Sequence, residues 1–321
     1  MESSYHIPVM LREVLEGLRI ESDGLYVDGT FGGGGHSQAI LEQLGLNGRV
    51  IGCDADAVAV ARAEEMFSAE SRLQIRHGYF SDICRELAQE NLELSGVLLD
   101  LGVSSRQLDS DQIGLSYRES MPLDMRFNRE SRTESAADII NDYSTEDLAT
   151  LFRQFGEEPA AWTIAQAISA RRVRGSIQTT GELRQTIEGV IPGRFIIKTL
   201  SRVFQALRIA VNDELGELER GLDCFINQLK VGGRIVVLTY HSLEDRIVKT
   251  KFREEEKGCE CPPGLPECQC GKKRRLRSTP RKPLRPTAEE VSANPRARSA
   301  KLRIGEKVAE EGEQTKYRKD R

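Results

Sequence analysis

The chain has 321 residues, of which 39% are hydrophobic and 30% are charged, and its formal net charge is −4. This composition is that of an ordinary globular protein with one or two cores, and it excludes a polycation. No apolar run approaches the roughly 20 residues that a membrane helix needs, and the first 14 residues lack a secretion signal. Seven cysteines, an odd number, fit a reducing compartment, so we expect a cytoplasmic protein without a membrane partner.

The first predicted strand ends in a carboxylate and leads into a glycine-rich loop. Leu25 to Asp28 is mostly apolar, residues 29–35 include five glycines, and Gln38 to Leu44 has the character of a helix. A strand, a glycine loop and a helix in this order are typical of the first unit of a nucleotide-binding α/β sheet. Glycine allows the backbone to approach a ligand closely.

This loop does not match the dinucleotide fingerprint. If the fingerprint G-x-G-x-x-G starts at Gly33, its third glycine falls at position 38, where this chain has Gln38. A second acid, Asp54, ends the next apolar run, 19 residues after Gly35, which is the spacing of a carboxylate that binds ribose hydroxyls. Two carboxylates repel a pyrophosphate but suit the cationic sulfonium and ammonium groups of S-adenosylmethionine. The residues therefore favour a methyltransferase over a nicotinamide oxidoreductase.

The pattern of strands and helices continues to Asp100. The next expected elements are a helix (57–66), a strand (73–77), a loop with Phe80 (78–81), a helix (82–90) and a strand that ends at Asp100 (96–100). In open α/β sheets, ligands bind outside the carboxyl ends of the strands. We therefore expect Asp28, Asp54, Phe80 and Asp100 to converge on one crevice.

A long insertion then interrupts the sheet. The next convincing strand, 234–239, begins more than 130 residues after Asp100, whereas a strand–helix–strand crossover takes only ~30 residues. The insertion is expected to be helical at 136–141, 148–155, 159–172 and 181–190, with a capping signal at Ser144.

The remaining elements complete the predicted domains. A long helix (201–229) should lead into the strand 234–239, Ser242 with Asp245 should cap the next helix, and 300–304 should form the last strand. We expect a discontinuous α/β domain (1–106 and 200–305), an inserted helical domain (107–199) and a mobile C-terminal tail (306–321).

A basic segment lies near the C-terminus. Residues 271–303 contain 12 Lys or Arg residues against two acids, Glu289 and Glu290. Such a segment is either a solvated tail or a contact surface for a polyanion such as RNA, whose phosphates Lys272, Lys273 and Arg274 would meet.

Four cysteines precede the basic segment. They are Cys259, Cys261, Cys268 and Cys270. Structural zinc sites usually use C-x₂₋₄-C pairs, and the one-residue spacing here differs from that pattern. We therefore favour a thiol loop braced by prolines over a metal site, and the sequence leaves the choice between the two open.

Several separate stretches together carry a resemblance to one family. They are 6–10, 28–37, 99–105, 122–126 (Pro-Leu-Asp-Met-Arg), 204–214 (Phe-Gln-Ala-Leu-Arg-Ile-Ala-Val-Asn-Asp-Glu), 241–249 (His-Ser-Leu-Glu-Asp-Arg-Ile-Val-Lys), 259–271 and 294–303. They resemble the bacterial MraW-type methyltransferases, which methylate N4 of a cytosine in the decoding region of 16S rRNA, and the similarity runs from about residue 6 to 305.

The resemblance implies a Rossmann-like α/β S-adenosylmethionine methyltransferase sheet with an inserted all-helical domain. It implies 16S rRNA of the small ribosomal subunit as partner and leaves a homodimer open. The sequence departs from the family pattern at 126–128 and 197–201, so no substrate contacts are carried over there. The cofactor residues that it implies are Gly34, Gly35 and His36 for the methionine end, Asp54 for the ribose, Phe80 for the adenine, and Asp100 with Gln107 to complete the pocket.

The catalytic residue is not identified by the sequence. Cytosine N4 is a poor nucleophile because its lone pair is delocalised into the ring, so methylation needs an acceptor for the N4 proton. Asp100 and His241 are the candidates, but Asp100 could serve only the cofactor and His241 could only help to start a helix. A non-enzymatic RNA-binding assembly factor, which would use the basic segment alone, remains the alternative function.

Overall fold

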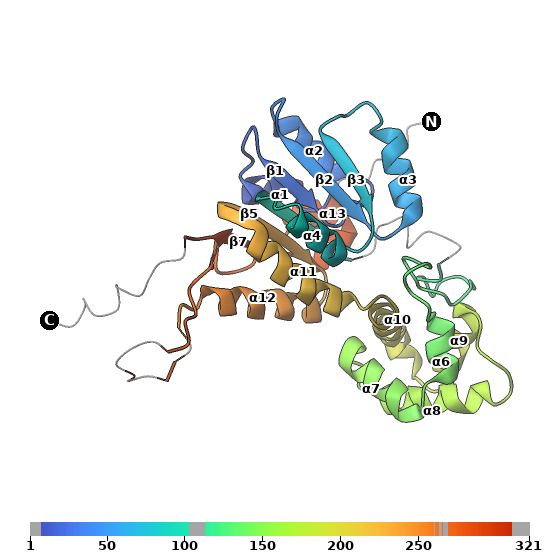
Figure 1. Cartoon of the computed structure of the whole chain (residues 1–321). Coiled ribbons are helices and arrows are strands. Elements are labelled where there is room, and N and C mark those ends of the chain that lie inside the picture. The colour runs from blue at the N-terminus through green and yellow to red at the C-terminus, as the bar shows by residue number, and fades with distance from the viewer. Residues whose placement is uncertain (1–7, 103–112, 260, 263–264, 266–268, 310–321) are drawn as a thin grey trace. The chain divides into compact units, whose positions relative to one another are not determined.

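The computed structural model describes residues 8–102, 113–259, 261–262, 265 and 269–309 (Figure 1). The chain divides into two compact units. One consists of Met1–Gly102 together with Glu217–Arg321, and the other of Val103–Gly216. Each unit has its own hydrophobic core.

A seven-stranded sheet forms the centre of the first unit, as far as its residues are described, in the order β3-β2-β1-β4-β5-β7-β6. The strands β1 to β5 are parallel, and β7 is antiparallel to both β5 and β6. This sheet confirms the predicted Rossmann-like α/β fold. Its strands are β1 (Leu25–Asp28), β2 (Arg49–Asp54), β3 (Leu73–His77), β4 (Leu94–Asp100), β5 (Leu229–Thr239), β6 (Leu276–Ser278) and β7 (Lys301–Lys307).

Helices cover both faces of this sheet (Figure 1). In β4, Val97 and Leu99 join the core under α4, α11 and α12, whereas Leu98 joins the core under α1 and α2. Because successive side chains of a strand point to opposite faces, a strand covered on both sides is apolar throughout. The helices are α1 (Leu11–Leu18), α2 (Gly35–Gln43), α3 (Ala57–Met66), α4 (Phe80–Gln89), α11 (Glu214–Gln228), α12 (Ser242–Glu256) and the short α13 (Ala288–Ala293).

The second unit is helical and has its own core, in which Phe152, Ile164 and Leu207 are fully buried. The side chain of Ser144 accepts a hydrogen bond from the Asp147 N–H at 3.1 Å, as its predicted capping role requires. Its helices are α6 (Ala136–Asp142), α7 (Thr145–Gly156), α8 (Ala161–Arg172), α9 (Thr180–Glu188) and α10 (Ile196–Asn212), with a 3₁₀ turn, η1, at Gly193–Phe195.

The prediction of one long helix over 201–229 is wrong. Two helices, α10 and α11, are separated by Asp213, which takes a left-handed conformation with φ of 52°. All of α10 belongs to the helical unit, so the boundary expected at residue 199 falls inside this helix. Helix α1 was not predicted, although Leu11, Val14 and Leu18 have helical spacing.

Part of the basic segment belongs to the sheet. Leu276 is buried, Arg275 pairs with Glu255 through two contacts of 2.6 and 2.7 Å, and Arg277 reaches Glu306 at 2.6 Å. The segment is therefore not simply a solvated tail. Strand β7 continues to Lys307, so the expected start of the mobile tail at residue 306 lies inside a strand, and residues 310–321 lie outside the described part of the chain.

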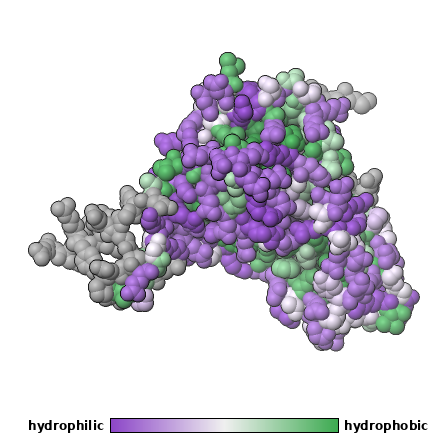
Figure 2. Space-filling model, viewed as in Figure 1, coloured by the Kyte–Doolittle hydropathy of each residue, from purple (hydrophilic) through white to green (hydrophobic). Residues whose placement is uncertain are grey.

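The surface seen in Figure 2 is mainly hydrophilic, with scattered apolar patches. The most exposed large apolar side chains, Leu46, Val173 and Ile197, lie in different segments. Within the described residues, no helix combines the length and the apolar character that crossing a membrane demands.

Candidate functional site

The glycine loop joins the carboxyl end of β1 to the start of α2. Gly34 has φ of 77°, and a Cβ added to it would lie 2.7 Å from the ring of Phe31 and 2.8 Å from that of Phe67. Only glycine fits this position without strain. By contrast, a Cβ on Gly33 would meet no described atom within 4 Å. The backbone is therefore open to a ligand just before the N–H groups of the α2 N-terminus.

Asp28 braces this loop from inside. Its carboxylate accepts hydrogen bonds from the Ser37 hydroxyl at 2.7 Å and from the Thr30 N–H at 3.2 Å. Asp28 is only 1% exposed, and this burial raises the pKa of its carboxyl group. The acid that ends β1 therefore shapes the loop and does not face solvent.

Asp54 holds the other side of the loop at the end of β2. One of its oxygens accepts the Gly32 N–H at 2.8 Å and the other accepts the Asp56 N–H at 2.9 Å. Burial raises the pKa of Asp54 to about 6, although both hydrogen bonds act to lower it.

Asp100 ends β4 and meets the loop from a third strand. Its carboxylate accepts a hydrogen bond from the Tyr240 hydroxyl at 2.7 Å, and its second oxygen lies 3.7 Å from Nδ1 of His36. The Asp100 N–H donates to the Thr30 hydroxyl at 2.6 Å. Burial raises the pKa of Asp100, but 23% of its side chain remains exposed, so a ligand can reach it.

Three carboxylates thus gather around one loop, at the ends of neighbouring parallel strands. The pKa of each is raised, in each case chiefly by burial. Among the described residues, no Lys or Arg is found within ion-pair distance of Asp28, Asp54 or Asp100. A buried cluster of acids that has His36 beside it but no Lys or Arg partner is typical of a functional site, and it favours a positively charged ligand.

Phe80 lies at the carboxyl end of β3 and is the first residue of α4, not a loop residue as predicted. Its ring packs on α11, where a Cβ added to Gly221 would lie 2.3 Å from it. Phe80 is 9% exposed, and the neighbouring Ser81 hydroxyl donates to Glu217 at 2.5 Å. The contact between α4 and α11 therefore fixes the position of this ring.

His241 begins α12. Its Nδ1 accepts the Glu244 N–H at 3.4 Å, and its Nε2 lies 3.0 Å from the Glu244 carboxylate. The predicted capping by Ser242 with Asp245 is wrong, because His241 and Glu244 form the capping box. Asp245 instead binds Lys301 at 2.8 Å and Arg303 at 2.7 Å, which ties α12 to β7.

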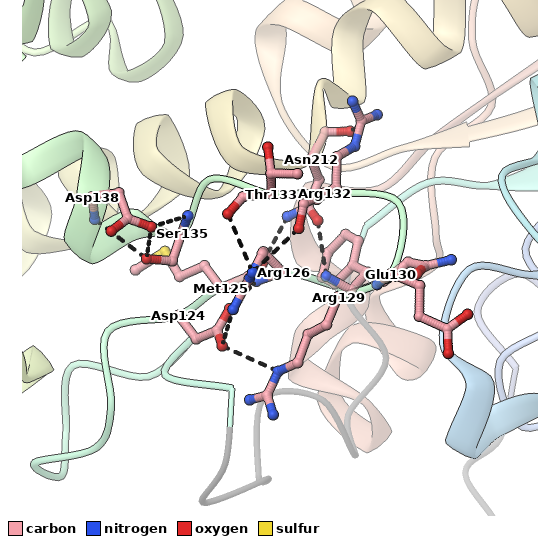
Figure 3. A network of polar contacts seen from close by, with 12 residues as sticks. Asp124, Met125, Arg126, Arg129, Glu130, Arg132, Thr133, Ser135, Asp138 and Asn212 are labelled. Atoms are coloured by element: carbon pink, nitrogen blue, oxygen red, sulfur yellow. Dashed lines mark hydrogen bonds and ion pairs between the residues drawn. The ribbon is translucent and has the colours of Figure 1, made fainter.

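A second polar network lies in the helical unit, where the stretches 122–126 and 204–214 meet (Figure 3). Arg126 donates to both oxygens of Asp124, at 2.6 and 3.0 Å, and Arg129 reaches the same carboxylate at 3.1 Å. Asn212 is fully buried and binds the carbonyl of Met125 at 2.8 Å and the Phe127 N–H at 2.9 Å. This network supports the left-handed turn at Met125, whose φ is 64°.

Several of these supporting residues were not found by the sequence analysis. Tyr240, Ser37 and Thr30 contact the predicted acids, yet nothing in their spacing indicates it. Cys84 of α4 and Cys224 of α11 form a disulfide. No disulfide was expected, because the cysteine count was taken to indicate a reducing compartment. Gln107 and Cys268, both named from the sequence, lie outside the described residues.

Comparisons with known proteins identify the family of this chain. A protein of Thermomicrobium roseum named ribosomal RNA small subunit methyltransferase H is 49% identical, over 97% of this chain and 96% of its own. A protein of the same name from Trichlorobacter lovleyi is 48% identical over 96% of this chain and all of its own length. A solved rRNA methylase from Streptococcus thermophilus covers 93% of this chain and 94% of its own, with a TM-score of 0.41 and 10% identity. The profile of the MraW methylase family matches residues 3–308, and the chain belongs to this family.

Proposed function

We propose that this protein transfers a methyl group from S-adenosylmethionine to N4 of a specific cytosine in the decoding region of 16S rRNA, in the small ribosomal subunit. The observation that carries the proposal is the group of three buried carboxylates around the glycine loop, which has no Lys or Arg partner among the described residues. Membership of the MraW methylase family supports methyl transfer, and the names of the relatives support small-subunit rRNA as the substrate.

The cofactor would lie along the carboxyl ends of β1, β2, β3 and β4. In this proposal Asp54 accepts the ribose hydroxyls, and Phe80 lies beside the adenine at the end of the next strand. Tyr240 binds only one oxygen of Asp100, and the other oxygen can accept a hydrogen bond from the α-ammonium group of the methionine end. The loop residues Gly34, Gly35 and His36 surround that end, and Gln107 completes the pocket.

The chemical step needs an acceptor for the proton of cytosine N4. As the lone pair of N4 attacks the methyl carbon, the bond from this carbon to sulfur breaks and the N4 proton is lost. If its free oxygen does not bind the α-ammonium group, Asp100 can accept this proton, because its carboxylate is partly exposed and burial has raised its pKa. His241 is less suited, since its Nδ1 accepts the Glu244 N–H in the capping box of α12.

The rRNA substrate would meet a group of exposed cations near β6. Lys249, Arg253 and Arg281 line a cavity of about 250 Å³ and suit phosphate groups. The target base has to leave any stack before the cofactor can reach it. Arg275 and Arg277 are less available than their sequence suggests, because carboxylates of this chain already bind them.

The proposal is tested by mapping the modified bases of small-subunit rRNA from cells with and without this protein. We expect one cytosine to lack a methyl group in cells without the protein. The methyl group should return when the wild-type gene is restored, but not when the Asp54→Ala gene is introduced instead. An unchanged methylation pattern would refute the proposal. If cells that lack the protein grow or assemble ribosomes poorly, and the Asp54→Ala gene fully restores them, the result would favour the non-enzymatic assembly factor.

The substitution Asp100→Asn, which keeps the shape of the side chain, distinguishes the two possible roles of Asp100, proton acceptor and cofactor ligand. A proton acceptor predicts a large fall in kcat with a nearly unchanged KM for S-adenosylmethionine. A role in cofactor binding alone predicts a raised KM and a largely retained kcat. Glu42→Gln, an exposed change on α2, serves as the control.

A further inference from the structure

The loop between α12 and β6 brings three cysteines together in the first unit. The sulfurs of Cys259, Cys261 and Cys270 all lie within 4.8 Å of one another, and those of Cys259 and Cys270 are 3.8 Å apart. Among the described cysteines, these three belong to no disulfide. Nothing in the proposed methyl transfer uses them.

The spacing of the sulfurs suits a tetrahedral metal ion. Zinc binds thiolate sulfur at about 2.3 Å, and two ligands of a regular tetrahedron at that distance are about 3.8 Å apart. This value agrees with the separation of the Cys259 and Cys270 sulfurs. The distance between two sulfurs in a disulfide is only about 2.05 Å, so the pair is not placed as a disulfide.

Backbone N–H groups point at two of these sulfurs. The Cys261 N–H donates to the sulfur of Cys259 at 3.4 Å, and the Gln269 N–H donates to the sulfur of Cys261 at 3.3 Å. Such donors stabilise the negative charge of a thiolate and orient it toward a metal. They are an observation independent of the sulfur–sulfur distances.

The spacing expected from the sequence considers each cysteine pair alone. Cys259 and Cys261 are only two positions apart, but the loop returns so that Cys270, eleven positions after Cys259, supplies the third sulfur. The loop is anchored at its C-terminal side by the ion pair between Arg275 and Glu255. A metal would join its two ends at the point where α12 gives way to the basic segment.

We propose that Cys259, Cys261 and Cys270 bind one Zn²⁺ ion as thiolates. The three thiols lose their protons to solvent on binding, and no oxidant or reductant is needed. Zinc is the choice because it accepts several thiolates in tetrahedral geometry and has no redox chemistry of its own. Its role is structural, since it would fix the shape of a loop that has few apolar residues.

The proposal is tested first on the full-length wild-type protein. The protein is purified under reducing conditions without chelator, and its metal content is measured by mass spectrometry. We expect about one zinc per chain, and a protein reloaded with Co²⁺ should show the charge-transfer absorption of cobalt bound to thiolates. A wild-type protein that holds no zinc, and that takes up none when zinc is added, would overturn the proposal.

Variants then identify the ligands. Cys259→Ser, Cys261→Ser and Cys270→Ser should each lower zinc affinity by about tenfold or more. Gln269→Ala is the matched control, because it keeps the backbone N–H that donates to Cys261 and should bind zinc as the wild type does. Zinc retained at full affinity by the triple Cys→Ser variant would refute these ligands. Cofactor binding, measured on the same samples, shows that each variant is folded and keeps this test separate from that of the methyltransferase.

Discussion

The two polar networks of this molecule, the acids around the glycine loop and the network around Asp124, use the same residue types in opposite ways. At the loop, Asp54 and Asp100 are held by N–H and O–H donors, and burial raises the pKa of both. In the helical unit, burial also opposes the charge of Asp124, but the guanidinium groups of Arg126 and Arg129 overcome it and lower the pKa. Among the described residues, no Lys or Arg balances the acids of the first network, whereas Arg126 and Arg129 neutralise the acid of the second.

Under the proposed function, this difference separates the expected ligand site from structural supports among the stretches that resemble the family. Asp245, in the stretch 241–249, belongs with the supports, because Arg303 and Lys301 lower its pKa against the effect of burial. A sequence motif alone does not distinguish these cases, but the partners of its carboxylates do. Variants of the two kinds should therefore fail in different assays.

The largest effect is expected for Asp54→Ala. The change removes the acceptor proposed for the ribose hydroxyls and also two hydrogen bonds that hold Gly32 and Asp56. The affinity for S-adenosylmethionine, measured by calorimetry, should fall on the order of a hundredfold, or about 3 kcal/mol. Asp23→Ala, an exposed change in the same unit, is the control. An affinity within twofold of wild type would remove Asp54 from the ligand site.

The second effect concerns the helical unit. Asn212→Ala should lower the free energy of unfolding by about 2–3 kcal/mol, because it leaves the Phe127 N–H and the Met125 carbonyl without their buried partner. Denaturant unfolding followed by circular dichroism measures this change. Gln154→Ala, at an exposed amide in α7, should have little effect. A large loss of cofactor affinity in folded Asn212→Ala protein would contradict the division between the two networks.

A smaller loss is expected for Asp245→Asn, which weakens the link from α12 to Lys301 and Arg303. The free energy of unfolding should fall by about 2 kcal/mol at pH 7. Since the folded protein lowers the pKa of Asp245, its contribution is present above the unfolded pKa and is lost as the pH falls through the folded value. The difference between wild type and variant should therefore shrink between pH 7 and pH 3. A difference that stays constant with pH would show that this charge is not involved.

The smallest effect is a dependence of cofactor binding on pH. The pKa of Asp54 is raised to about 6 without cofactor, and ribose hydroxyls would donate to its ionised form. Protons therefore compete with the cofactor, and its affinity should fall by about tenfold between pH 7 and pH 5. Calorimetry at a series of pH values measures this slope, and Asp54→Asn should lack it. Equal slopes in both proteins would assign the titration to another group, such as Asp100.

The sequence predicted the elements whose signals are local. Helix α3 (Ala57–Met66) and strand β3 (Leu73–His77) begin and end where their apolar spacing placed them. The acids at the strand ends were found because parallel strands bring their carboxyl ends to one edge. The break at Asp213 was missed, since an Asp in a left-handed turn has no strong sequence signal inside a helical pattern.

The contacts that depend on the folded chain could not be predicted. The Tyr240–Asp100 hydrogen bond joins residues 140 positions apart, and the Ser81–Glu217 bond joins residues 136 apart. No local pattern encodes either pair. His241 was weighed as a base and as a helix start, and only the position of Glu244 in the folded protein shows that it caps α12.

The position of the helical unit between β4 and β5 has a consequence for synthesis on the ribosome. These strands are neighbours at the centre of the sheet, yet β4 ends at Asp100 and β5 begins at Leu229. At about 5–20 residues per second, roughly 10 s separate their emergence from the exit tunnel. During that time the edge of β4 that pairs with β5 has no partner strand, so the centre of the sheet cannot be completed until the helical unit has been made.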